Sequence, residues 1–341
     1  MLNKTQYTQF ARATAAFALI VIVLGAYVRL TDAGLGCPDW PGCYGTLTVP
    51  RGEAAIDAAN SAYPERPVES GKAWREMAHR YVAGILGLLV FALAFFAWKR
   101  RKEPGQPLGL PMALSVLIIF QAALGMWTVT LLLKPAVVTA HLLGGMTTLA
   151  LLWWLALRSQ GVRASAPLPG WLRPAAIGGL VILTMQIALG GWTSTNYAAL
   201  ACVDFPTCHG QWLPWMAADQ AFQIWTGLGV DHEGGVLPNE ARITIHGVHR
   251  LGALITFLYI GGLAAAILAT TSGRGLRLAA VAMGAALSVQ VGLGIANVLM
   301  SLPLAVATAH NGMAAVLAVT VVTVIQLTSK GPERVNHSKR Q

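Results

Sequence analysis

Eight long apolar runs constrain this chain more than any other feature of its sequence. They lie at about 10–30, 76–98, 111–133, 136–157, 172–194, 244–269, 277–300 and 303–328. A membrane-spanning helix needs roughly 20 consecutive apolar residues, and in lipid only a helix or a closed barrel satisfies every backbone polar group. Only 11% of the 341 residues are charged, against about 25% in soluble domains. The sequence therefore predicts an all-α membrane protein with eight transmembrane helices, and it argues against a water-soluble globular enzyme.

The basic residues are distributed unequally between the two sides of the predicted helices. An even number of spans places both termini on one side, and most of the 24 Lys and Arg residues fall there, opposed only by Glu103 and Glu333. Positive charge is retained in the cytoplasm. We therefore expect cytoplasmic termini, with two long loops, about 31–75 and 195–243, on the outer side. The net charge of +10 then reflects topology, so membrane lipid is an expected partner and nucleic acid is not.

The two halves of the chain resemble each other in the order of their motifs. Both contain a C-x5-C segment with an Asp-aromatic-Pro centre, then His-Arg at the start of a span, Gln-x3-Gly and Thr-Ala-His. The matched pairs are Cys37–Cys43 and Cys202–Cys208, His79-Arg80 and His249-Arg250, Gln121–Gly125 and Gln290–Gly294, and Thr139–His141 and Thr308–His310. This pattern predicts an internal duplication that gives two tandem four-helix bundles, residues 1–160 and 161–341. The first span has a counterpart in the second half, which favours a retained helix over a cleaved signal peptide.

Four histidines recur at the duplicated positions, all in spans that begin on the outer side. They are His79, His141, His249 and His310. A histidine in an apolar helix is usually a hydrogen-bonding residue, but two imidazoles from facing helices can supply both axial ligands of a haem. Zinc or copper is the competing ligand, although the spans lack clustered thiolates or further histidines. Arg80 and Arg250 are candidate partners for haem propionates, and interfacial snorkelling explains them equally well.

The two halves differ at one position beside these histidines. Glu76 stands three residues before His79, whereas His246 stands three residues before His249. A di-iron site would need Glu-x-x-His twice and two more carboxylates, which excludes that chemistry. Glu76 could accept or relay a proton beside one haem. The alternative is an exposed acid at a helix N-terminus.

This ordered set of residues resembles the haem A synthase family, over nearly the whole chain. The resemblance implies oxidation of the C8 methyl group of haem O to a formyl group by successive hydroxylation, giving haem A for terminal oxidases. It implies that His79 and His141 flank the substrate haem O, with Glu76 as the essential acid. His249 and His310 would bind haem B as a cofactor that relays electrons, while His246 has no assigned role and is expected to form a hydrogen bond.

The resemblance also implies a location and partners. We expect a bacterial inner membrane, haem sites toward its outer face, and haem O synthase and terminal oxidase assembly factors as partners. The electron acceptor is not identified, and a homo-oligomer is left open. The main alternative function is a membrane di-haem cytochrome that only transfers electrons, and a transporter is the third. His209 and His232 are expected to be surface residues, and His337 lies in a polar tail.

The four cysteines are predicted to form two local disulfides, Cys37–Cys43 and Cys202–Cys208. Both pairs lie in predicted outer loops, where an oxidising compartment lets disulfides persist, and each segment contains a proline that favours a turn. Each half carries its own complete pair, which supports pairing within a loop. Free thiols that bind metal or exchange electrons with a partner are the alternative.

Overall fold

Eight long helices make up most of the computed structural model, which describes residues 2–164, 168–212 and 217–329. They are α1 (Lys4–Leu30), α3 (Ser70–Lys99), α4 (Gly109–Thr130), α5 (Pro135–Gln160), α6 (Leu172–Thr195), α8 (Asn239–Thr270), α9 (Arg274–Leu299) and α10 (Leu304–Leu327). All eight are long and apolar enough to cross a bilayer. The prediction of an all-α protein with eight spans is confirmed, and the chain is a multi-pass membrane protein.

Three helices begin several residues earlier than the apolar pattern predicts. Helix α1 starts at Lys4, α3 at Ser70 and α8 at Asn239, before the apolar runs at about 10, 76 and 244. The added turns contain charged side chains such as Lys72 and Glu240. Hydropathy finds the lipid-spanning part of a helix, whereas the backbone hydrogen bonds continue beyond it into a polar turn.

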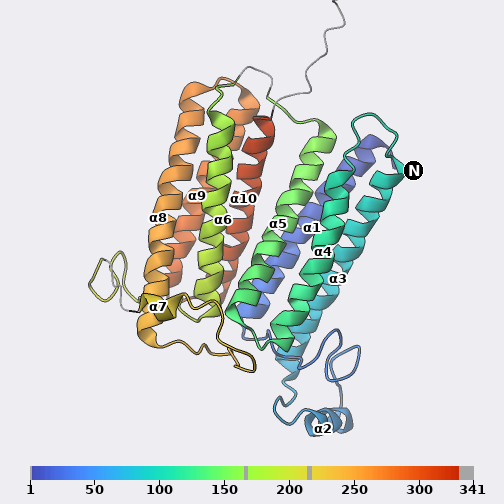
Figure 1. Cartoon of the computed structure of the whole chain (residues 1–341), viewed down its shortest axis with the longest axis vertical. Coiled ribbons are helices and arrows are strands. Elements are labelled where there is room, and N and C mark those ends of the chain that lie inside the picture. Colours follow the sequence, from blue (N-terminus) through green and yellow to red (C-terminus); the bar gives the residue numbers. More distant parts are fainter. Residues whose placement is uncertain (1, 165–167, 213–216, 330–341) are drawn as a thin grey trace, which may run out of the picture.

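The long helices form two neighbouring groups, α1, α3, α4 and α5 on one side and α6, α8, α9 and α10 on the other (Figure 1). The groups meet where α1 packs on α10, and where α5 packs on α6 and α10. Both long loops lie at one end of the molecule, together with the short helices α2 (Glu53–Ala62) and α7 (Ala218–Ala221), and the N-terminus lies at the opposite end (Figure 1). This arrangement agrees with the predicted halves, while their origin by duplication stays a prediction.

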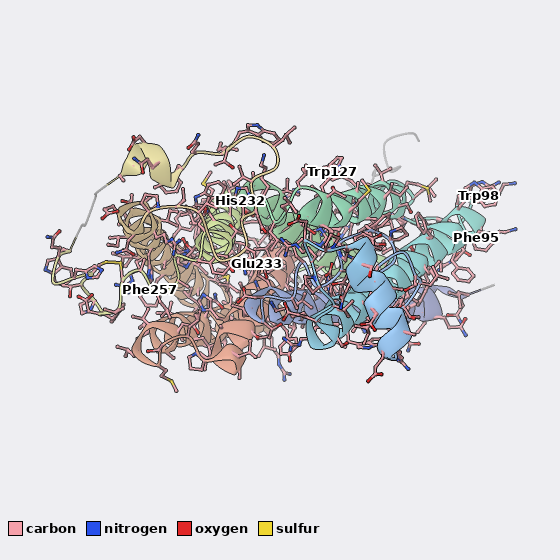
Figure 2. All side chains as sticks on the ribbon, turned by 90° about the horizontal axis from the view of Figure 1, so that it is seen from below. Phe95, Trp98, Trp127, His232, Glu233 and Phe257 are labelled. Carbon is pink, nitrogen blue, oxygen red and sulfur yellow. A yellow bond between two sulfur atoms is a disulfide. The ribbon has the colours of Figure 1, made fainter. Side chains whose placement is uncertain are left out.

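The outer perimeter of the helices is apolar. Seen from the loop end, the labelled side chains Phe95, Trp98, Trp127 and Phe257 lie at the periphery (Figure 2). Each is more than a third exposed. Exposed apolar side chains all round a set of long helices are the surface expected to face lipid. The buried core runs continuously through both groups and includes Tyr7, Leu93, Leu152, Ile260 and Val321.

Small residues and polar side chains join the two groups. A Cβ atom at Gly191 of α6 would lie 3.0 Å from Leu142 Cδ2, and one at Gly312 of α10 would lie 3.0 Å from Val23 Cγ2. Glycine at these positions lets the helices approach closely, as is common between membrane helices. Further along, the indole of Trp153 donates to the Thr323 hydroxyl at 2.8 Å. The halves are therefore packed against each other over much of their length.

The loop after α1 and the loop after α6 contain the same local structure. Disulfides join Cys37 to Cys43 and Cys202 to Cys208, as predicted. In the first loop Asp39 accepts the backbone N–H groups of Tyr44 and Gly45, and in the second Asp204 accepts those of His209 and Gly210. Hydrogen bonds from the Thr207 hydroxyl and from these N–H groups hold the pKa of Asp204 well below its usual value.

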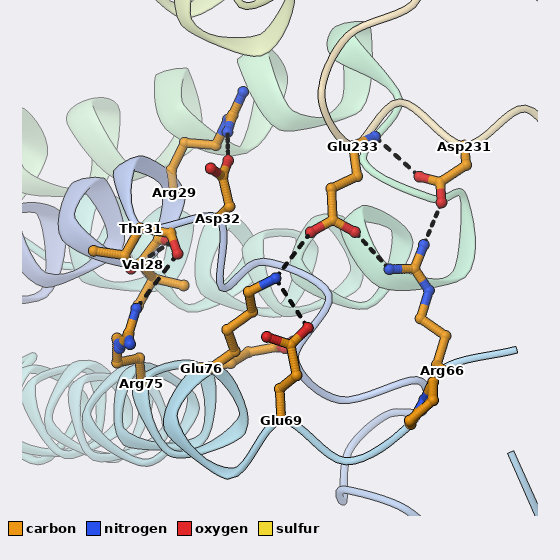
Figure 3. A network of polar contacts seen from close by, with 12 residues as sticks. Val28, Arg29, Thr31, Asp32, Arg66, Glu69, Arg75, Glu76, Asp231 and Glu233 are labelled. Atoms are coloured by element: carbon orange, nitrogen blue, oxygen red, sulfur yellow. Dashed lines mark hydrogen bonds and ion pairs between the residues drawn. The ribbon is translucent and has the colours of Figure 1, made fainter. Parts of the chain in front are cut away.

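The second long loop also reaches across to the first half. Arg66 forms ion pairs with Asp231 and Glu233, and Lys72 lies between Glu233 and Glu69 (Figure 3). The outer ends of the two groups are thus held together by charged side chains as well as by apolar packing.

Candidate functional site

The four predicted ligand histidines each lie against a glycine of the preceding span. A Cβ atom on the glycine would approach the imidazole Cε1 atom to 2.9–3.3 Å in all four cases. The pairs are Gly25 with His79, Gly125 with His141, Gly190 with His249, and Gly294 with His310. Real Cβ atoms rarely come so close to another side chain. Each imidazole can therefore occupy its position only because the facing residue is glycine and has no Cβ atom.

One large cavity of about 1730 Å³ contains all four histidines. Its walls include residues of both groups of helices, among them Glu76, Gln121, Gln186 and Gln290. A pocket for a single drug-sized ligand is typically about 300–1,000 Å³. The cavity is therefore large enough for more than one bulky ligand, and the structure brings both histidine pairs to the same space.

Glu76 is buried, and its two carboxylate oxygens have different partners. Oε2 accepts the backbone N–H of Cys37 at 2.8 Å, and Oε1 lies 2.5 Å from Nη2 of Arg80. The residue is 5% exposed and lines the cavity one turn before His79. The alternative of an exposed acid at a helix start is wrong, because α3 begins six residues earlier, at Ser70, and the first loop covers the carboxylate.

His246 occupies the matching place in the second half. Its Nδ1 atom accepts the backbone N–H of Cys202 at 3.2 Å, and the side chain is buried. The expected hydrogen-bonding role of His246 is confirmed.

Arg80 and Arg250 both line the cavity and both bind carbonyl oxygens of the adjacent loop. Arg80 donates to Asp39 O at 2.9 Å, and Arg250 donates to Asp204 O at 2.8 Å and Cys202 O at 2.9 Å. Each arginine therefore fastens its loop to the start of the span. Their role toward propionates stays a prediction, supported for Arg250 by its Nε atom, which is buried and has no hydrogen-bond partner in residues 2–164, 168–212 and 217–329.

Several other buried polar atoms around the histidines have no hydrogen-bond partner among the described residues. They are Nδ1 of His79 and His141, Oε1 of Gln121, Gln186 and Gln290, Oγ1 of Thr139 and Thr308, and Oδ1 of Asn297 and Asn311. Buried polar groups are nearly always hydrogen-bonded in a native protein. Together with the glycine-bordered imidazoles, these atoms fit a flat, mostly apolar group that carries iron and acidic substituents, which is the chemistry of a haem.

Two further histidines, His209 and His232, do not line this cavity. His209 is exposed, with Nε2 2.9 Å from Ala201 O. His232 is 1% exposed and contacts Leu132 O and the Thr226 hydroxyl, so its prediction as a surface residue is wrong. It is buried because the second loop folds onto the turn between α4 and α5. His337 lies outside the described residues. Among those that are described, no group of three His, Cys, Asp or Glu residues could hold a metal ion.

The polar cavity residues that sequence reasoning missed include Gln186, Asn297 and Asn311. All three stand in apolar spans, where a polar side chain is costly and often functional. Gln186 also precedes Gly190 by one turn, as Gln121 precedes Gly125. Searching for that spacing in every span would have found it.

Comparison with known proteins identifies the family. A family model described as "Cytochrome oxidase assembly protein" matches residues 8–322. A Heme A synthase from Shewanella oneidensis is 48% identical over 94% of this chain and 96% of its own length. This chain belongs to the haem A synthase family. More distant members include Heme A synthases from Bradyrhizobium sp. (strain BTAi1), 28% identical over 94% of this chain and 90% of the relative, and from Sphingopyxis alaskensis, 29% identical over 89% and 87%.

Membership of the haem A synthase family confirms the resemblance noted from the motifs. The match extends through both groups of helices and both long loops. The electron-transfer cytochrome is not supported.

Proposed function

We propose that this protein is a haem A synthase that oxidises the C8 methyl group of haem O to a formyl group. The observation that carries the proposal is a buried carboxylate, Glu76, beside one of the two histidine pairs in a shared cavity. A protein that only passes electrons has no need for that acid in one half alone. Haem O as substrate is consistent with the family.

The substrate haem O is assigned to the first half, between His79 and His141. The cofactor haem B is assigned to the second half, with His249 and His310 as its iron ligands. When bound there, haem B supplies one-electron redox chemistry. One cavity borders both histidine pairs, which supports two haem sites in one chain, and Glu76 beside the first pair supports placing the substrate in that half.

Glu76 is assigned the catalytic role of accepting or relaying a proton at the substrate site while the methyl group is oxidised, the electrons leaving to the electron acceptor named below as a partner. Its contacts with Arg80 and with the Cys37 N–H fix the carboxylate one turn from His79. The first loop, fastened by Arg80 and the disulfide, limits access of water to the acid. His246 occupies the matching place in the second half, where its Nδ1 accepts the N–H of Cys202, and it is assigned no role in proton transfer.

We further propose that both termini are cytoplasmic, so that both long loops and the haem sites lie toward the outer face of a bacterial inner membrane. The distribution of Lys and Arg supports this orientation. The matched loops and glycine–histidine pairs support an origin of residues 1–160 and 161–341 by duplication. Haem O synthase, oxidase assembly factors and an electron acceptor are the proposed partners.

The test is production of haem A in a cell that otherwise lacks it. The full chain is expressed with a haem O synthase in such cells, and the extracted haems are identified by chromatography and mass. Appearance of haem A is the expected result. Accumulation of haem O alone, with the protein folded in the membrane, would contradict the proposal.

A further inference from the structure

Three glutamines stand one turn before the glycines that border the histidines. They are Gln121 before Gly125, Gln186 before Gly190, and Gln290 before Gly294. The corresponding position before Gly25 in α1 is Val21, which is buried and lines the cavity. The glutamines contact the histidines in two different ways.

In the second half, both imidazoles are held at a ring nitrogen. Gln186 Nε2 lies 3.1 Å from His249 Nδ1 and donates to His249 O at 3.0 Å. His310 Nδ1 lies 3.1 Å from the backbone carbonyl of Gln290, whose side-chain Nε2 is 3.3 Å from His310 Nε2. Each ring is therefore fixed by a glutamine of the span before it.

In the first half, neither imidazole is held in this way. Gln121 Nε2 donates to the backbone carbonyl of His141 at 2.6 Å, not to its ring. Val21 has no polar atom to offer His79. The Nδ1 atoms of His79 and His141 are buried, and neither has a hydrogen-bond partner in the described part of the chain.

Contacts of this kind alter how firmly a histidine binds a metal. A partner at the second ring nitrogen fixes the tautomer and the ring orientation, and its loss typically costs about 10–100-fold in metal affinity. The contact of His310 Nδ1 with Gln290 O favours the Nδ1–H tautomer, in which Nε2 can bind iron once the Gln290 side-chain amide turns away from it. Iron binding through Nε2 of His249 needs the Nδ1–H tautomer, and the Gln186 amide can accept that N–H by turning its Oε1 to the ring, an oxygen that has no hydrogen-bond partner in the described part of the chain.

We propose that Gln186 and Gln290 are positioning residues that make the second half retain its haem, and that the unheld imidazoles of His79 and His141 make the first half the site of haem exchange. This inference rests on the proposed function and deepens it, because an enzyme that modifies a haem must release one haem and keep the other.

The test measures how fast haem B leaves the purified full-length protein for excess apomyoglobin. Gln186→Leu removes both contacts to His249 while keeping a side chain of similar size. We expect haem B to leave about 10–100-fold faster than from the parent protein, with altered haem absorption bands. Gln121→Leu is the matched comparison, since that glutamine lies in the first half and its amide nitrogen binds only the backbone of His141, and it should change haem B release far less than Q186L does. An unchanged rate for Q186L, or an equal acceleration by Q121L, would overturn the proposal.

Thermal unfolding of the haem-free proteins separates a loss of positioning from a loss of fold. If Q186L does not accumulate, Gln186→Asn is measured in the same way, because it keeps the amide but withdraws it from the ring. Release is measured with haem B alone, so the result does not depend on whether haem A is formed. A protein that makes no haem A could still show the predicted order of rates.

The first half offers the reverse experiment. Val21→Gln supplies α1 with the glutamine that the other three spans have, and Val21→Leu controls for the larger side chain. We expect V21Q to release added haem O several-fold more slowly than the parent or V21L. Equal release by all three would contradict the link between the missing glutamine and exchange.

Discussion

The two halves place different side chains in the same position beside their first histidine. In both, the backbone N–H of the first loop cysteine donates to a side chain three residues before that histidine. The acceptor is the carboxylate of Glu76 in the first half and the imidazole of His246 in the second. Both satisfy the N–H, so loop structure alone does not require the acid. The difference therefore points to chemistry in the first half.

The arginines that follow the histidines show what the acid changes locally. Arg250 gives its Nη atoms to three loop carbonyls, those of Cys202, Asp204 and Thr207. Arg80 also binds loop carbonyls but turns its Nη2 to Glu76. A charged partner of this kind offsets part of the cost of burying an ionised carboxylate, and its removal would leave that charge unpaired. The first half thus carries a paired charge that the second half replaces with neutral hydrogen bonds.

The largest expected effect comes from removing iron ligands in the two halves separately. His249→Ala or His310→Ala should abolish binding of haem B and all haem A formation, since each removes one of two axial ligands. His79→Ala or His141→Ala should stop haem A formation while haem B remains. Haem content and absorption spectra of the purified variants check this. Normal haem B in a variant that lacks both His249 and His310 would reverse the assignment of the halves.

Glu76→Gln should be the next largest change. The amide keeps the shape and can still accept the Cys37 N–H, but it cannot accept a proton in the working pH range. We expect haem A formation to fall by about 10²–10⁴-fold, with haem B retained. Glu53→Gln, in the exposed helix α2, is the control and should leave haem A formation unchanged. If E76Q formed haem A at the rate of the parent protein, Glu76 would have a structural role and not a catalytic one.

Removing a disulfide should destabilise each half by a similar amount. On the chain-entropy model, opening so small a loop costs about 2–3 kcal/mol. Cys37→Ser with Cys43→Ser and Cys202→Ser with Cys208→Ser are compared by denaturant unfolding in mixed micelles. Only the first pair should also lower turnover, because Cys37 holds Glu76. Non-reducing peptide mapping of the parent should find the bonds within each loop, and bonds between the loops would refute this pairing.

The glycines that border the imidazoles should tolerate alanine poorly. A Cβ at Gly294 would lie 3.1 Å from His310 Cε1, whereas Gly292, two residues earlier in α9, has nothing within 4 Å. Gly294→Ala should cost about 1–3 kcal/mol through overpacking and should shift the haem absorption bands. Gly292→Ala should be neutral or slightly stabilising, because alanine favours the helix. If Gly294→Ala and Gly292→Ala changed stability and the absorption bands equally, the contact between Gly294 and His310 would have no special role.

The sequence predicted some of these features because their signals are local. Apolar length is enough to find the eight spans, and the repeated Cys and His motifs locate both loops and the four predicted ligand histidines. The glycine–histidine contacts could not be predicted, since they depend on how each helix is rotated against its neighbour. The burial of His232 was missed for a related reason. It follows from a contact with Leu132, a hundred residues away, that no local pattern records.

The smallest expected effect concerns the ion pairs that join the loop of the second half to the first. Arg66 binds Asp231 and Glu233, and both acids are partly exposed. Pairs in such positions are screened by water and salt and typically contribute about 0.2–1 kcal/mol each. Arg66→Gln should therefore lower the free energy of unfolding only slightly, and less at high salt. Arg51→Gln is the control, because the Arg51 guanidinium lies over the Trp74 ring and forms no ion pair with these acids. It tests whether the loss of any loop arginine lowers the free energy of unfolding by the same amount. If R66Q lost haem A formation altogether, catalysis would depend on the loop contact that fixes the position of the second half against the first. The difference between Glu76 and His246 would then not be enough to explain why the two halves differ in function.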